Sequence, residues 1–289
     1  MNKKIVKFSN KMNEIGLIRK GGLTSVELTL FYTLLHLIKE NPDKIFEIDG
    51  AYVRETSGYG KKAKKTRKEF RDDLASLFEK LKETKYKRKD GEKEVEFELF
   101  KWGRSPKDSY CGKDEDFVIF RVNPKFQSWF NNKELKANFT LFELDDILSL
   151  RGTYAKEMYR FLMQFKSTGV WRVGIEDFRR LMGVPESYRF SAIYQNVTGP
   201  SIQKMTDNSK GKQIFKEVEL LKNKNYKGEI TGYVFKFKKP DVVVKKIETN
   251  EQQEAEKQKV LSDEDVKENK EFDERLKTFF DKKEDDWYG

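Results

Sequence analysis

The chain has almost none of the two residue types on which disulfide and transition-metal chemistry depend. Cys111 is the only cysteine and His36 the only histidine among 289 residues. One cysteine excludes a disulfide framework within the chain and a thiolate zinc cluster. One histidine excludes a rolling-circle nuclease that holds its metal through a pair of histidines. His36 lies among leucines of a predicted helix, so we expect a structural role for it.

Other absences argue against nucleotide-driven motors and membrane proteins. Gly60-Lys61 and Gly112-Lys113 lack both the earlier glycine and the following hydroxyl residue of a phosphate-binding loop. The sequence has no signal peptide and no long apolar run, so we expect a soluble, cytoplasmic protein without a membrane partner. Alternating Glu96 and Glu98 indicate the solvated face of a hairpin rather than a nuclease site. We therefore predict no enzymatic activity and no cofactor or metal.

The charges are abundant and unevenly distributed. Lys and Arg number 59 against 49 Asp and Glu, a net charge of +10. Residues 241–289 hold 10 basic and 16 acidic residues, which leaves 49 against 33 in residues 1–240, so the first 240 residues carry a net +16. A basic body attracts polyanions such as nucleic acid. A lysine-rich chain from an AT-rich genome would have the same composition, so composition leaves both explanations open.

The last segment differs in character from the rest. From about Lys245 the chain is mostly Gln, Glu, Lys and Asp, with too few apolar residues to offset the entropy of ordering, which predicts a flexible acidic tail. The tail ends in a short amphipathic patch that contains Phe272, Leu276, Phe279, Phe280 and Trp287. A helix docked on the body and a partner-binding peptide both fit this patch.

The second half of the body has the element order of a helix-turn-helix with a wing. Thr153 can cap a helix whose apolar residues recur at three- and four-residue steps up to Phe165. Val170–Val173 alternates as a short strand, and Ile175–Met182 is a second amphipathic helix that Gly183 and Pro185 end. Strands at 213–221 and 230–237 would flank a basic wing.

A third helix, from about Phe190 to Met205, follows the turn. Ile193, Val197, Ile202 and Met205 form its apolar set. Its other faces carry polar residues that are able to contact base edges and phosphates. The DNA-contacting residues that we predict in this domain are Arg189, Tyr194, Gln195, Asn196, Thr198, Ser201, Lys204, Lys222 and Lys224.

The first half repeats this architecture without repeating the sequence. Thr24-Ser-Val-Glu27 is a capping box that opens a helix to about residue 39. The predicted elements that follow are a strand at 46–48, a helix at 51–56, a helix at about 62–82 and a hairpin with strands 85–89 and 94–100. Phe117–Val122 and Phe126–Phe130 are expected to be elaborations that close this domain.

Basic residues gather at the start of the long helix of the first half. A solvated charge run is one explanation, and contact with DNA phosphates is the one that its place in a winged helix favours. The hairpin adds a basic wing. The DNA-contacting residues that we predict in this domain are Lys61, Lys62, Lys65, Arg67, Lys68, Lys87 and Arg88.

Several motifs between Leu148 and Met205 occur together in one known family. They are the Tyr-Ala-Lys and Met-Tyr-Arg-Phe-Leu helix, the Gly-Val-Trp strand, the helix and turn Ile-Glu-Asp-Phe-Arg-Arg-Leu-Met-Gly-Val-Pro, and Pro-x-Ile in the third helix. Together they resemble the second winged-helix domain of plasmid replication initiators of the RepB, RepE and π type, which bind iterons, the short direct repeats of plasmid origins. One departure is that Tyr194 and Gln195 stand where that family often has Arg or Lys.

The resemblance implies both a fold and a function. The expected fold class is α+β, with two tandem winged-helix domains at 1–137 and 138–244 and a disordered acidic tail at 245–289. The second domain would contact the repeat in the major groove, and the first would contact the flanking backbone and mediate dimerisation. In such a family, monomers bind origin repeats in double-stranded DNA and open the AT-rich neighbour with a host initiator and helicase. Dimers in equilibrium with them repress their own promoter.

Two other functions remain open at this stage. A winged-helix transcriptional repressor without a replication role would bind an inverted repeat and never open DNA. A metal-dependent origin nicking enzyme would instead relax supercoiled plasmid in the presence of magnesium or manganese.

Overall fold

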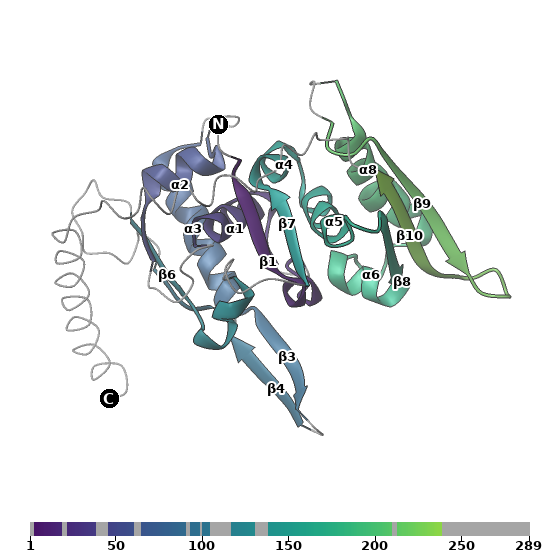
Figure 1. The fold of residues 1–289 in the computed structure, drawn as a ribbon, viewed down its shortest axis with the longest axis horizontal. Helices are drawn as coiled ribbons and strands as arrows, with labels where there is room; N and C mark the ends of the chain where they lie inside the picture. Colours follow the sequence, from purple (N-terminus) through teal and green to yellow (C-terminus); the bar gives the residue numbers. More distant parts are fainter. Residues whose placement is uncertain are drawn as a thin grey trace, which may run out of the picture. The chain divides into compact units, whose positions relative to one another are not determined.

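The computed structural model describes residues 3–18, 22–38, 46–60, 65–90, 93–98, 100–104, 117–130, 138–209 and 213–238 (Figure 1). Lys61, Lys62 and the predicted tail lie outside these residues. Residues Met1–Pro240 form one compact unit. No helix within the described ranges is long and apolar enough to cross a membrane.

The later winged helix has the element order that the sequence predicts. Its elements are α5 (Thr153–Gln164), β8 (Val170–Gly174), α6 (Ile175–Met182), α7 (Phe190–Ile193), the π-helical turn η4 (Tyr194–Thr198), α8 (Gly199–Thr206), β9 (Glu217–Lys224) and β10 (Ile230–Lys238). The three strands form one antiparallel sheet in the order β8–β10–β9. Figure 1 shows β9 and β10 extending side by side into a wing beyond α8.

The boundaries of α5 and α6 follow from backbone geometry at their ends. Gly152, rather than Thr153, is the N-cap residue of α5, and no side chain caps this end, so the predicted Thr153 cap is wrong. Gly183 ends α6 in the left-handed conformation, with φ of 57°, and its N–H donates to the carbonyl of Arg179. A side chain disfavours that conformation, which is why the Gly-x-Pro sequence marked the end correctly.

The earlier winged helix uses the same strand order. Its elements are α1 (Ser25–Ile38), β2 (Phe46–Asp49), α2 (Gly50–Ser57), α3 (Arg67–Lys82), β3 (Lys85–Asp90), β4 (Lys93–Glu98), β5 (Phe100–Arg104), β6 (Phe117–Val122) and the 3-10 helix η3 (Pro124–Trp129). The capping box at Thr24 and Glu27 forms, with Glu27 accepting from the Thr24 N–H at 2.7 Å. A second box, Thr66 with Glu69, starts α3 at Arg67, later than the sequence indicated. The sheet runs β2–β6–β5.

One prediction for the first domain is confirmed and another is wrong. The β3–β4 hairpin forms as predicted, and it is a two-stranded sheet separate from the domain's three-stranded sheet. Strand β6 is the central strand of that sheet, not an elaboration of it. A hairpin pattern specifies the pairing of its own two strands, whereas the choice of further partners depends on residues far along the chain.

Five of the described elements were not predicted. They are β1 (Ile5–Ser9), the 3-10 helix η1 (Asn10–Glu14), β5, β7 (Phe139–Glu143) and α4 (Leu144–Ser149). Strand β1 pairs with β7 in an antiparallel register, and the two lie between α1 and α5 (Figure 1). The predicted division of the chain at residue 138 stays a prediction; β7 begins directly after it and pairs with the first strand of the chain.

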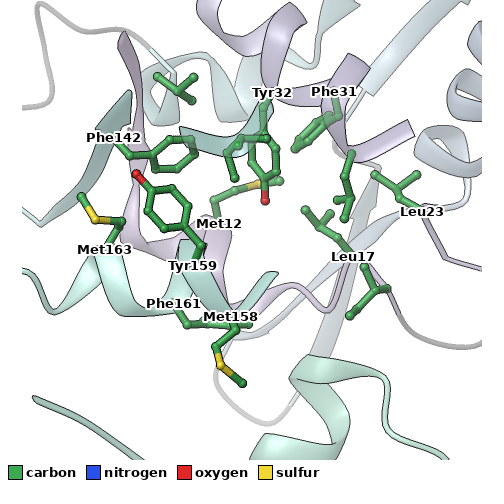
Figure 2. Packing of buried hydrophobic residues seen from close by; sticks show 14 of the residues in the cluster. Met12, Leu17, Leu23, Phe31, Tyr32, Phe142, Met158, Tyr159, Phe161 and Met163 are labelled. Carbon is green, nitrogen blue, oxygen red and sulfur yellow. The ribbon is translucent and has the colours of Figure 1, made fainter. Parts of the chain in front are cut away.

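Phe142 of β7 lies at the centre of the aromatic packing. Its ring contacts those of Tyr32 and Tyr159 edge to face, with centroids 5.5 and 5.4 Å apart. Tyr32 comes from α1 and Tyr159 from α5, and Figure 2 shows both side chains in the cluster around Phe142. A hydrophobic core therefore connects α1 and α5 through the β1–β7 sheet.

A buried polar cluster ties the same elements together. Arg160 of α5 has no exposed surface, and its guanidinium donates to the carbonyls of Met12 and Ile15 at 3.0 and 3.2 Å. It also donates to Glu157 at 2.6 Å, and Glu157 accepts from the Tyr32 hydroxyl at 2.8 Å. We call these five residues the Arg160 cluster. A buried ion pair stabilises little by itself but penalises other arrangements of its partners.

His36 has the structural environment that the sequence suggested. Its Nδ1 lies 2.7 Å from the carbonyl oxygen of Ile5 and so connects α1 to β1.

Candidate nucleic-acid interface

The third helix of the second domain consists of α7, η4 and α8 in direct succession. All the residues at the junctions have right-handed helical angles, so one helix extends from Phe190 to Thr206. Ile193, Val197 and Met205 are buried on one side. The helix contacts α5 of the same domain, which fixes its outward face.

Arg179 holds the turn that leads into this helix. Its guanidinium donates to the carbonyl oxygens of Pro185 and Tyr188 at 3.0 and 2.6 Å. These bonds join the end of α6 to the start of α7 and so set the angle between the two helices. Arg179 was not predicted to have this role, although its position four residues before the Gly-Val-Pro turn is a signal in the sequence.

The outward face carries side chains suited to base recognition. Tyr194 is 54% exposed, and Gln195, Asn196 and Lys204 are exposed, as predicted. Arg189, just before the helix, is exposed as well. Amide side chains match the paired acceptor and donor of adenine in the major groove. The structure therefore brings these five predicted residues to one end of the domain, on or next to one helix.

Gln203 belongs to this surface and was missed. It is exposed on α8 one residue before Lys204, and no hydrogen bond joins its side chain to another residue in the described parts of the chain. It is an amide in the same helix as Gln195 and Asn196, so the residue type was a sufficient signal. Gln203 lies eight residues after Gln195, so the sequence did not show that it is exposed on the same helix as Gln195 and Asn196.

Thr198 and Ser201 do not belong to this surface. Thr198 has no exposed surface and Ser201 has 2%, and the Ser201 hydroxyl donates to the carbonyl of Val197 at 2.5 Å. Their predicted contact with DNA is corrected on this ground: both side chains face inward. The reason is the π-helical turn, which changes the side of the helix that these two positions occupy.

The wing of the second domain is a rigid basic loop. Lys222 and Lys224 are exposed on β9, as predicted. Asn225 closes the turn because its Oδ1 accepts from the backbone N–H groups of Lys227 and Glu229 at 2.9 and 3.0 Å. Tyr226 at the tip is 92% exposed, another feature without a role in the sequence analysis.

In the first domain, α3 occupies the place of the third helix. Arg67 and Lys68 are exposed in its first turn and have no bond with another described residue. Lys65 is different, because its Nζ lies 2.7 Å from Asp73 Oδ2. The Tyr59 hydroxyl donates to the same oxygen, and burial together with this bond raises the pKa of Tyr59 well above its usual value. Lys65 is thus already paired within the domain.

Lys87 and Arg88 lie on β3, away from the three-stranded sheet. The backbone register places Lys87 opposite Glu96 and Arg88 opposite Val95. Lys85 and Lys89 are likewise opposite glutamates of β4. In this hairpin, lysines at alternate positions of β3 are therefore paired with glutamates at alternate positions of β4.

Across the ranges that the structure describes, no three His, Cys, Asp or Glu side chains gather as metal ligands. The third helices of the two domains and the wing carry positive charges and hydrogen-bond donors and acceptors, the groups with which proteins contact DNA phosphates and bases.

Comparisons with known proteins agree with this assignment. The description "Initiator Replication protein, WH1" matches residues 5–163, and "Initiator Rep protein, WH2" matches residues 174–237. The "Probable replication protein rep" of Bifidobacterium longum (strain NCC 2705) is 28% identical over 187 residues. That alignment covers 65% of this chain and 59% of the relative, so the chain spans less than two thirds of that protein's length.

A solved structure has the same fold. The crystal structure of the Pi initiator protein in complex with iteron DNA superposes with a TM-score of 0.60 at 14% identity, over 84% of this chain and all of that one. Two tandem winged-helix domains are thus common to both the family and the fold. With both family domains present in order along most of its described length, this chain belongs to the initiator replication protein family.

Proposed function

We propose that this protein binds repeated sequences in double-stranded origin DNA and initiates plasmid replication there. The observation that carries the proposal is the exposed face of the α7–α8 helix, with Gln195, Asn196 and Lys204, on a winged helix of the initiator family. Support comes from the Pi initiator, whose structure holds iteron DNA on the same fold. No catalytic step is part of this proposal.

The two domains would contact different parts of the DNA. The second would discriminate bases, because amides pair with base edges. The first would hold the DNA backbone through Arg67 and Lys68, because guanidinium and ammonium groups at an exposed helix start contact phosphates without selecting a base. The proposed division of the chain is 1–137 and 138–244, with 245–289 as a tethered tail.

The assembly and its partners are proposals as well. We propose a homodimer in equilibrium with a monomer, with the monomer bound to repeats and the dimer acting as repressor. The host initiator and helicase would join the monomer at the origin. The site of action would be the cytoplasm, where plasmid DNA is.

A footprint over the region upstream of the gene tests the proposal directly. Full-length protein should protect several direct repeats spaced by about 10 or 21 base pairs, that is one or two helical turns, beside an AT-rich tract. Permanganate should then detect unpaired thymines in that tract when host factors are added. A single protected inverted repeat without unpairing would favour the repressor instead.

The nicking alternative has its own assay. Supercoiled origin plasmid incubated with the protein and magnesium or manganese should stay supercoiled. Conversion to open circles, absent with a plasmid that lacks the origin, would overturn the non-enzymatic proposal.

A further inference from the structure

The third helix of the second domain contains one wide turn. Within η4 the Gly199 N–H donates to the carbonyl of Tyr194, five residues back, where a regular α-helix bonds four residues back. Pro200 favours this turn, since it has no N–H and its ring would collide with the carbonyl of Asn196 in a regular helix. Glycine at position 199 permits the wide turn, because in this conformation the Cβ of any other residue would lie only 2.8 Å from the Tyr194 carbonyl oxygen.

The wide turn explains an unusual burial pattern. Ile193, Val197, Ser201 and Met205 are all buried and follow one another at intervals of four residues. At about 100° per residue, three such intervals would drift by about 120° around a regular helix. One extra residue in a wide turn removes about 100° of that drift, which leaves the four nearly in line. The period of four in the sequence is therefore the signature of the π-helical turn.

The same correction acts on the exposed face. Gln195 and Gln203 are eight residues apart, which in a regular helix places them about 80° apart around the axis. With one residue absorbed by the wide turn they are effectively seven steps apart, and a seven-residue step deviates by only about 20°. The pair Asn196 and Lys204 has the same spacing. Gln195, Asn196, Gln203 and Lys204 are all exposed.

We propose that the π-helical turn determines sequence specificity by aligning Gln203 with Gln195, so that both amides contact bases in one major groove. This inference rests on the proposed function and adds a residue and a mechanism to it. Seven steps of 1.5 Å separate the two amides by about 11 Å along the helix, or about three base pairs. The two should therefore select bases about three positions apart.

The first test replaces Gln203 by Ala. The residue is exposed and makes no hydrogen bond with another described residue, so the variant should fold. Affinity for the footprinted site should fall by about 5- to 150-fold, the worth of a bidentate base contact, while binding to random DNA stays unchanged. Selection from a randomised site should show that Gln203→Ala and Gln195→Ala each relax one position, about three base pairs apart. Equal losses on cognate and random DNA, or no loss, would overturn the inference.

The second test removes the wide turn with Gly199→Ala. Gly174→Ala is the matched control, because a Cβ there meets nothing within 4 Å and φ is −65°. We expect Gly199→Ala to lose at least as much preference for the cognate site as Gln203→Ala does, and Gly174→Ala to stay within about twofold of the parent. A folded Gly199→Ala protein with full specificity would contradict the mechanism. If circular dichroism finds it unfolded, the Gln203→Ala result decides.

Binding by the unsubstituted protein distinguishes failure of the proposed function from failure of the inference about Gln203. If it binds all sequences alike, the proposed function fails along with the inference. If it prefers its site and Gln203→Ala prefers it equally, only the inference fails.

Discussion

The two winged-helix domains of this chain have the same sheet and different surfaces. The sheet orders are β2–β6–β5 and β8–β10–β9. In each domain the last strand of the sequence, β6 or β10, is central and pairs with the two earlier strands. The first domain inserts the β3–β4 hairpin after its third helix, whereas β9 follows α8 without such an insertion. Arg67 and Lys68 begin the third helix of the first domain, whereas amides line that of the second.

This difference teaches that the fold determines where an exposed helix face lies, and that the sequence of that helix determines which side chains the face carries. Both third helices are held by buried residues on one side, Phe70, Leu74 and Leu77 in α3 and Ile193, Val197 and Met205 in the other. The outward residues are then free to differ. The predictions below test whether the domains divide backbone contact and base discrimination, and what joins them.

The largest effect is expected at the Arg160 cluster, where α5 contacts α1 and η1. Arg160→Met should lower the free energy of unfolding by about 3 to 5 kcal/mol, because it leaves Glu157 buried without its partner. Urea denaturation measures this. Lys82→Met is the control: its ion pair with Glu79 joins two exposed side chains of one helix, so a loss of about 1 kcal/mol or less is expected.

A double variant sharpens that measurement. Glu157→Leu with Arg160→Met removes both charges and should be less destabilised than Arg160→Met alone. A single variant that loses less than about 1 kcal/mol would mean that the Arg160 cluster does not stabilise the packing of α5 against α1 and η1.

Base discrimination in the second domain is the next largest effect. Gln195→Ala and Asn196→Ala should each weaken binding to the cognate site by about 1 to 3 kcal/mol and leave random DNA unaffected. Competition binding with both DNAs measures the ratio. Equal losses on the two would assign these amides to backbone contact and erase the contrast between the domains.

Stability of the first domain should depend on acid through Glu27. Burial alone would raise the pKa of Glu27, but hydrogen bonds from Lys80, Ser76 and Thr24 outweigh burial and hold the pKa below its usual 4.5. A lowered folded pKa contributes stability above the unfolded pKa that is lost as the pH falls through the folded one. These bonds join α1 to α3.

Glu27→Gln should therefore cost about 1 to 3 kcal/mol at pH 7, and the difference from the parent should shrink below about pH 4. Chemical denaturation at several pH values measures both. A difference that does not change with pH would mean that packing, not charge, holds α3 in place.

The smallest effect is expected at the start of α3. Changing Arg67 and Lys68 to Gln should weaken binding to all sequences and lower the log–log salt slope by about 0.9 for each phosphate that the variant no longer neutralises. The preferred site should stay the same. A changed site preference with an unchanged slope would give the first domain a role in base discrimination.

How much of this could be predicted depends on how far apart the interacting residues are. Capping boxes, glycine stops and alternating strands act within a few residues, so the sequence predicts α1, α6, β8 and both hairpins. It also predicts the exposed Gln195, Asn196 and Lys204. The family followed from motifs within one such stretch of the chain.

Contacts between residues far apart in the chain could not be predicted from the sequence. The pairing of β1 with β7 joins strands about 130 residues apart in the sequence, Ile5–Ser9 and Phe139–Glu143, and no local pattern specifies it. Glu157 and Arg160 are ordinary charged residues of an amphipathic helix until their partners on α1 and η1 cover them. Burial of a charge is a property of what packs against it.

The third helix of the second domain, Phe190 to Thr206, lies between these extremes. Its location and its residue types are set by the sequence, which alone places amides and lysine on a helix after a Gly-Val-Pro turn. Which of them face outward was decided by the wide turn at Tyr194–Thr198, which buries Thr198 and Ser201 and exposes Gln203. The physical reason is that a side chain's direction accumulates along the helix, so one extra residue per turn changes the side of every position beyond it.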